Sequence, residues 1–215
     1  MKKTKKKFDV NLFVLFLALM IVAVTMTYII GDYTNKAKIR TLTIRYEYEI
    51  SNVTTRMEKF FDNYSKALTY IDVARSHLKN ALYHFDLAQY QLNEGDYRNI
   101  SSSCGAALYY YNSSNHVFTK SLAFIVNSQS HTPQTYKELL TYYLNYTSAG
   151  INLTIAGKKM VSALSSAAEY YSQEKTTKGD DSLAVLNTFK VEYDNYQSLF
   201  EQSLLAIKDL YGIRE

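Results

Sequence analysis

The chain has 215 residues, of which 47% are hydrophobic, and it contains one proline, seven glycines and one cysteine. Its formal net charge is +4, but residues 1–7 include five lysines, so the rest carries about one net negative charge and offers no basic surface for nucleic acid. A single cysteine, Cys104, excludes an intrachain disulfide and thiolate metal clusters. We expect it to be a small buried hydrophobic residue, with an interchain bridge as the alternative.

Residues 10–30 form an apolar run without a charged residue, glycine or proline. As a helix at about 1.5 Å per residue, the run would extend roughly 31 Å, which matches the hydrocarbon core of a bilayer. A lone segment in lipid can satisfy its backbone hydrogen bonds only as a helix. We therefore predict that residues 10–30 are a transmembrane signal anchor that contacts membrane lipid, preceded by a basic tail at residues 1–9.

The charges that flank this run predict its orientation. The lysines before it are denser than the basic residues after it, which are mixed with Asp32 and Glu47. Because the denser basic cluster is normally cytoplasmic, we expect the N-terminus inside and the body outside the cell membrane. A cleaved signal peptide starts in the same way and remains an alternative, although residues 25–27 make a poor cleavage site. A buried helix of a soluble protein is a third interpretation.

An apolar residue recurs every three or four positions from Ile39 to Leu92, as on one face of a helix. The first part of this stripe consists of Ile39, Leu42, Tyr46, Ile50, Val53, Met57 and Phe60. Residues 41–50 also alternate as a strand would, but no second strand is evident to pair with them. Residues 31–35 are turn-like, or one continuous helix passes through them. Gly95 is placed as a helix C-cap, and Asp96 as the N-cap of the next helix.

Three further helices follow, at residues 97–127, 133–171 and 182–211, with loops at 127–131 and 172–181. Thr132 and Pro133 suggest an N-cap followed by proline at the first helical position. Short loops make consecutive helices antiparallel, so the expected fold is all-α: a single transmembrane helix, then an up-down-up-down four-helix bundle with a long first helix. We assign residues 31–62 to a helical stalk and residues 63–215 to the bundle.

A loop centred near residue 130 would pair the second and third helices at positions that add to about 261. Residues 104–107 would then face residues 154–157, and Tyr111 would face Gly150. In this register Gly105 and Gly157 lie at a close helix contact, so leucine at either position should overpack it. Gly157→Ala should be neutral or stabilising, because alanine favours helix.

The sequon Asn-x-Ser/Thr occurs six times, whereas the Asn, Ser and Thr content predicts about two by chance. The candidate glycosylation sites are Asn52, Asn63, Asn99, Asn112, Asn145 and Asn152. None follows residue 154, so the last helix has none. Polar composition alone is the alternative explanation. The pairs 52/63 and 145/152 are eleven and seven residues apart, and each pair therefore lies on one helical face.

No motif indicates chemistry. His77 and His84 share a face, but no Glu-x-x-His pair accompanies them, and that pair is typical of di-iron bundles. Nucleophile-elbow and phosphate-loop spacings are absent from the sequence. We therefore expect no metal, no cofactor and no enzymatic activity.

Tyrosine is abundant, with 21 residues, and several are adjacent in the chain. The runs lie at 109–111, 142–143 and 170–171. Neighbouring helical residues point about 100° apart, so each run places at least one tyrosine away from the core. These side chains either pack at the boundary of the core or contribute to a partner-binding surface.

The first helix is about twice as long as the helices that fold back on it, roughly 90 Å against 45 Å. The stripe from Ile39 to Phe60 therefore needs another cover: a second copy as a coiled coil, or another membrane subunit. A helix break near residues 51–52 that folds the stalk onto its own bundle is the alternative. We expect a non-catalytic accessory or scaffolding subunit of a membrane or cell-surface complex. A sensor-type ligand-binding bundle is the alternative function.

Overall fold

The computed structural model describes residues 10–212, with side chains in the first helix from Phe16 onward; the basic tail at residues 1–9 lies outside the described residues. The elements are α1 (Val10–Asn93), α2 (Tyr97–Gln129), the 3-10 helix η1 (Gln134–Tyr136), α3 (Lys137–Ser172) and α4 (Thr176–Leu210). The described residues include no strand, which confirms the all-α class. The chain divides into two compact units, Met1–Thr54 and Thr55–Glu215.

In the first unit, α1 is helical through residues 31–35 and 41–50, so the continuous-helix interpretation is correct and the strand alternative is wrong. Its N-terminal part is long and apolar enough to cross a membrane, by length and composition. The hydroxyls of two threonines in this part donate hydrogen bonds to backbone carbonyls of the same helix. Thr25 donates to the carbonyl of Ile21 at 2.7 Å, and Thr27 to that of Ala23 at 2.8 Å. These bonds satisfy the only donors that the side chains of residues 16–27 would carry into lipid.

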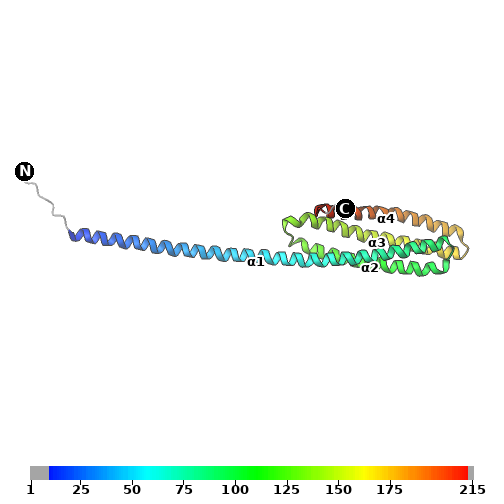
Figure 1. Ribbon diagram of the computed structural model, residues 1–215, viewed down its shortest axis with the longest axis horizontal. Helices are drawn as coiled ribbons and strands as arrows, with labels where there is room; N and C mark the ends of the chain where they lie inside the picture. Colours follow the sequence, from blue (N-terminus) through cyan, green and yellow to red (C-terminus); the bar gives the residue numbers. More distant parts are fainter. Residues whose placement is uncertain (1–9, 213–215) are drawn as a thin grey trace, which may run out of the picture. The chain divides into compact units, whose positions relative to one another are not determined.

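In the second unit, α2, α3 and α4 lie alongside the C-terminal part of α1 (Figure 1). Two buried serines of α2 donate to carbonyls of α1: Ser114 Oγ to Ala74 O at 2.8 Å, and Ser121 Oγ to Ala67 O at 2.9 Å. Both pairs of positions add to 188, so the two helices are antiparallel. The alanines that α1 buries here recur every seven residues, at 67, 74, 81 and 88. Small side chains at this period allow close packing of two helices.

Helices α2 and α3 are also antiparallel, but the predicted register is wrong. An added Cβ at Gly157 would collide with the ring of Tyr111, and one at Gly150 would lie 2.8 Å from the ring of Phe118. Both pairs add to 268, so the true register differs from the predicted one by seven residues, about two turns. The reason is the connection: α2 extends to Gln129 and η1 precedes α3, which moves the midpoint of the link toward residue 134.

This register changes the interpretation of two glycines. Gly105 is exposed, and nothing lies within 4 Å of the place its Cβ would occupy, so the expected overpacking by Gly105→Leu is wrong. Gly157 lies under an aromatic ring, so the expectation that Gly157→Ala is neutral or stabilising is also wrong. The steric clash outweighs the helix propensity of alanine, which is worth up to about 1 kcal/mol.

Two helix ends differ from the prediction. Thr132 is buried and donates its hydroxyl to the carbonyl of Ser128 at 2.7 Å, so it closes α2 rather than capping α3. The expected loop at 172–181 is also wrong, because α4 begins at Thr176. The end of α3 is closed by Glu174, whose φ is 59°, and the next amide donates to the carbonyl of Tyr170 at 2.9 Å. This left-handed closure usually uses glycine, so a glutamate there gives no signal in the sequence.

The end of α1 confirms the predicted C-cap. Gly95 has a φ of 72°, and the amide of Asp96 donates to the carbonyl of Gln91 at 2.9 Å. Asp96 precedes α2 but makes no side-chain capping bond to its backbone; it accepts a hydrogen bond from Asn99 Nδ2 at 2.7 Å.

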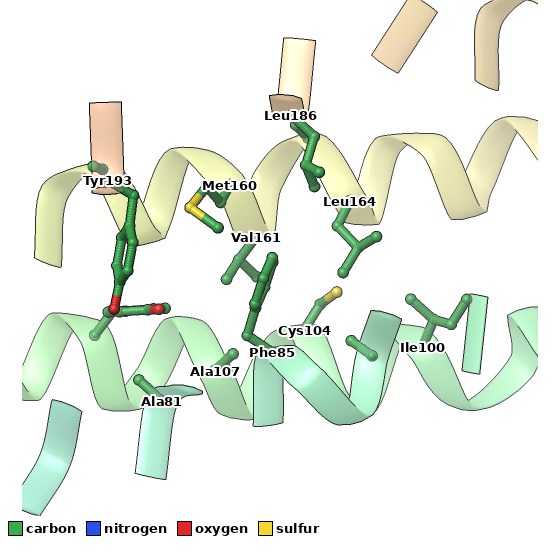
Figure 2. Packing of buried hydrophobic residues seen from close by; sticks show 14 of the residues in the cluster. Ala81, Phe85, Ile100, Cys104, Ala107, Met160, Val161, Leu164, Leu186 and Tyr193 are labelled. Carbon is green, nitrogen blue, oxygen red and sulfur yellow. The ribbon is translucent and has the colours of Figure 1, made fainter. Parts of the chain in front are cut away.

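The core of the second unit takes side chains from all four helices (Figure 2). Phe85 of α1, Cys104 of α2, Leu164 of α3 and Leu186 of α4 meet in one cluster. Cys104 is 2% exposed, and burial raises the pKa of its thiol to about 11. It is therefore the inert hydrophobic residue that the sequence suggested.

We predict that Gly157→Ala and Gly150→Ala lower the free energy of unfolding by about 1–3 kcal/mol each, because the new methyl group displaces the ring of Tyr111 or Phe118. Gly105→Ala is the matched control on an open position of α2, where it should be stabilising by up to about 1 kcal/mol. Thermal unfolding of the detergent-solubilised full chain, followed by circular dichroism, measures these changes. Equal stability of the Gly157 and Gly105 variants would contradict the register.

Candidate interaction surface

An exposed apolar stripe on α1 is the strongest candidate for a functional surface. In the first unit it consists of Ile39, Leu42, Tyr46, Ile50 and Val53, each at least 50% exposed. At about 100° per residue, these five residues lie within an arc of about 80°. We call these five residues the α1 stripe.

The two other predicted stripe residues belong to the second unit, and they differ from each other. Met57 is 39% exposed, whereas Phe60 is fully buried. The ring of Phe60 stacks on Tyr64, with centroids 5.5 Å apart, and also contacts Tyr136. Phe60 is therefore part of the bundle core, seven residues before the first of its small buried alanines.

The α1 stripe follows an eleven-residue repeat that the sequence analysis missed. Residues 39–49 (IRTLTIRYEYE) align with residues 50–60 (ISNVTTRMEKF), with identical residues at four positions. The identities are Ile39/Ile50, Thr43/Thr54, Arg45/Arg56 and Glu47/Glu58. The steps of three, four and four residues between successive stripe positions are the signal of this repeat. An eleven-residue period means 3.67 residues per turn, whereas the bundle part of α1 follows seven.

Charged residues border the α1 stripe with opposite signs. By helical spacing, Arg45 lies about 100° to one side of its centre and Glu47 about 100° to the other. Both recur eleven residues later, as Arg56 and Glu58. Within the chain, Arg45 Nε donates to Glu49 Oε1 at 3.0 Å on the arginine side. The stripe thus has one predominantly basic edge, which also carries Glu49, and one predominantly acidic edge, which also carries Arg40.

The predicted sequons lie at accessible positions. Asn63 is half-buried, and the other five asparagines are exposed. Asn145 and Asn152 border an open groove between α3 and α4 of about 420 Å³, together with Tyr142, Tyr196 and Leu199. Asn52 lies about 120° from the centre of the α1 stripe, so a glycan there would leave the stripe uncovered.

The tyrosine run at 109–111 divides between core and surface, as its spacing predicts, whereas both tyrosines at 142–143 and both at 170–171 are half-buried. Tyr111 is fully buried, Tyr110 is half-buried, and Tyr109 is 64% exposed. Tyr110 contacts the two histidines that share a face of α1. The centroid of its ring lies 6.0 Å from that of His77 and 5.5 Å from that of His84. No three His, Cys, Asp or Glu side chains of the described residues form a group that could hold a metal ion.

Several buried tyrosines keep their protons to high pH. Burial raises the pKa of Tyr111 and of Tyr146, and an interaction of the Tyr111 hydroxyl with that of Tyr193 raises the pKa of Tyr111 further. The hydroxyl of Tyr146 finds no hydrogen-bond partner among the described residues. Burial also raises the pKa of Tyr193 to about 12. The hydroxyls of Tyr64 and Tyr211 lie 3.0 Å apart, and burial of Tyr64 raises its pKa as well.

No family model matches the chain, and no curated protein or solved structure matches it.

We predict that the free energy of unfolding falls as the pH rises above 10. An unfolded tyrosine ionises near 10, whereas Tyr193 stays protonated to about 12 and Tyr111 to a higher pH still. The folded pKa values are raised, so this stabilisation is complete below pH 10 and is lost above it, by up to about 1.4 kcal/mol per pH unit for each tyrosine. Denaturant titrations between pH 8 and about 12, with phenolate absorbance, measure this.

Tyr111→Phe should make this pH dependence shallower, because it removes one buried ionisable hydroxyl. Tyr109→Phe is the control, since Tyr109 is exposed and lies outside the core. An unchanged slope for Tyr111→Phe would show that this hydroxyl does not contribute.

Proposed function

We propose that this chain is a single-pass membrane protein that acts as a non-catalytic accessory or scaffolding subunit of a membrane or cell-surface complex. Residues 10–30 are its signal anchor, residues 1–9 are cytoplasmic, and the helical body is outside the cell membrane. The observation that carries the proposal is the α1 stripe, which follows the anchor and leaves five large apolar side chains at least half exposed. A contiguous apolar surface of this kind is typical of a protein–protein contact.

Two further features support the anchor. From Phe16 to Ile30 every described side chain is exposed, including large apolar ones that would be unfavourable in water. The hydroxyls of Thr25 and Thr27 are bonded to the helix backbone, as a lipid environment requires.

The filled core supports a subunit over the alternative of a ligand-binding sensor. Tyr111, Phe118 and Tyr146 occupy the space between the helices and are at most 1% exposed. The groove along α3 and α4 is open to solvent, whereas small-molecule sites usually enclose most of their ligand.

The six sequons fit the proposed topology, because N-linked glycans are added only to extracytoplasmic segments. We propose that the exposed asparagines are glycan acceptors in a host that carries out this modification. Their absence from α4 leaves that helix free of glycans of its own.

We predict that protease added to intact cells digests the body and leaves a small anchored fragment, because only residues 1–9 are cytoplasmic. An epitope tag at the N-terminus and another at the C-terminus distinguish the two orientations: the C-terminal tag should be lost and the N-terminal one kept. Permeabilised cells are the control. A protected C-terminal tag in intact cells would contradict the orientation.

We predict that a photo-crosslinking amino acid at Tyr46 gives one dominant protein adduct in intact membranes, whereas the same residue at Tyr48 gives little. The two tyrosines are similarly exposed, at 62% and 67%, but lie about 160° apart on α1. Only Tyr46 belongs to the α1 stripe. Absence of a protein adduct at Tyr46, with lipid adducts only, would contradict a binding role for this surface.

A further inference from the structure

We propose that the partner of the α1 stripe is a second copy of this chain, paired in parallel and in register along residues 39–53. The proposal rests on the proposed function, because the anchor at residues 10–30 gives both copies the same direction and starting level. Two copies then place Ile39, Leu42, Tyr46, Ile50 and Val53 opposite their own counterparts. Met57 continues the same repeat at the next position.

The eleven-residue period favours a partner with the same repeat. On a helix of 3.6 residues per turn, a seven-residue repeat drifts by about 20° per repeat in one sense, and an eleven-residue repeat drifts by a similar angle in the other. A seam built on heptads would therefore wind away from the α1 stripe within a few turns. A second copy has the same sequence and therefore the same eleven-residue period. Its apolar side chains would stay in contact with the α1 stripe along the whole segment.

Only one face of this segment is apolar in both repeats. Ile44 and Tyr48 are also exposed, on the opposite side of the helix. Eleven residues later their positions hold Thr55 and Lys59, which are polar. The α1 stripe keeps its apolar character over both repeats, with Ile39, Leu42 and Tyr46 followed by Ile50, Val53 and Met57. The repeat thus identifies this face as the seam of the pair.

The edge charges favour a parallel pair over an antiparallel one. When two helices pair in parallel about a two-fold axis, opposite edges adjoin, so the Arg45 edge of one copy faces the Glu47 edge of the other. In an antiparallel pair like edges adjoin, which places arginine beside arginine and glutamate beside glutamate. Glu49 lies on the basic edge, where it accepts a hydrogen bond from Arg45 of its own chain. The recurrence at Arg56 and Glu58 repeats the complementarity.

Cysteine crosslinking of the full chain in membranes tests the pair. Leu42→Cys and Val53→Cys, each in a Cys104→Ala background, should form disulfide-linked homodimers under mild oxidation. Thr41→Cys and Thr55→Cys are the matched controls, because both positions are exposed and lie on the opposite face. These controls should remain monomeric. Equal crosslinking at the stripe and at the control positions would indicate random collision and overturn the proposal.

Charge reversal tests the parallel orientation without relying on cysteine. The double variant R45E/R56E makes both edges acidic, and E47R/E58R makes both basic. Each double variant should weaken the dimer of the detergent-solubilised full chain. The expected change is an increase of about tenfold in the dissociation constant of the dimer at low salt. Combining all four substitutions exchanges the charges of the two edges, so opposite charges adjoin again and the dimer should be restored. Failure of the combined variant to recover would overturn the parallel arrangement.

The outcomes separate this proposal from the proposed function. If Leu42→Cys and Val53→Cys form no homodimer, while the photo-crosslinker at Tyr46 reaches one different membrane protein, the second copy is excluded and a subunit role stands. If no protein adduct forms at Tyr46 either, both proposals are overturned.

Discussion

The contact of Tyr111 with Gly157 is the constraint on which the bundle depends most. A ring can lie against the α3 backbone only where a Cβ is missing, and Phe118 repeats the contact at Gly150 seven residues away. Two such contacts on one face set the register of α2 and α3 to a single value. The arrangement also buries the hydroxyl of Tyr111, which interacts with that of Tyr193 on α4. Steric fit in the core decides the register.

Beside these aromatic residues, about 60° around the helix, α2 approaches α1 through small and hydroxyl-bearing residues. Buried serines at 114 and 121 donate to carbonyls of α1, and the alanines opposite them leave room for close approach. Helix α1 thus uses two periods for two tasks. Its alanines recur every seven residues inside the bundle, whereas the α1 stripe recurs every eleven residues in the first unit. The change of period coincides with Phe60, the first fully buried residue among the α1 side chains that the structure describes, from Phe16 onward. One helix therefore carries both a packed and an unpaired surface.

Much of the architecture follows from the local pattern of the sequence. The apolar run at 10–30, the helical period after it and the glycine stop at Gly95 are readable because each depends on neighbours within a few turns. The α1 stripe was also recognisable, and so was its exposure up to Val53. Its eleven-residue repeat was present in the same residues, yet it becomes clear only when the buried part of α1 is separated from the exposed part.

By itself, the sequence determined the helical class, the membrane-spanning candidate and the faces of the helices, since these depend on spacing along one chain. Only the tertiary structure decided the register of α2 against α3, the start of α4 and the burial of Phe60. The physical reason is that these features depend on contacts between distant segments. Thr132 donates a hydrogen bond to the carbonyl of Ser128, and η1 lengthens the connection between α2 and α3. Glu174, which is not a glycine, adopts the left-handed conformation that ends α3. The conformations of a few residues in these connections therefore shifted the helix positions by whole helical turns from those predicted.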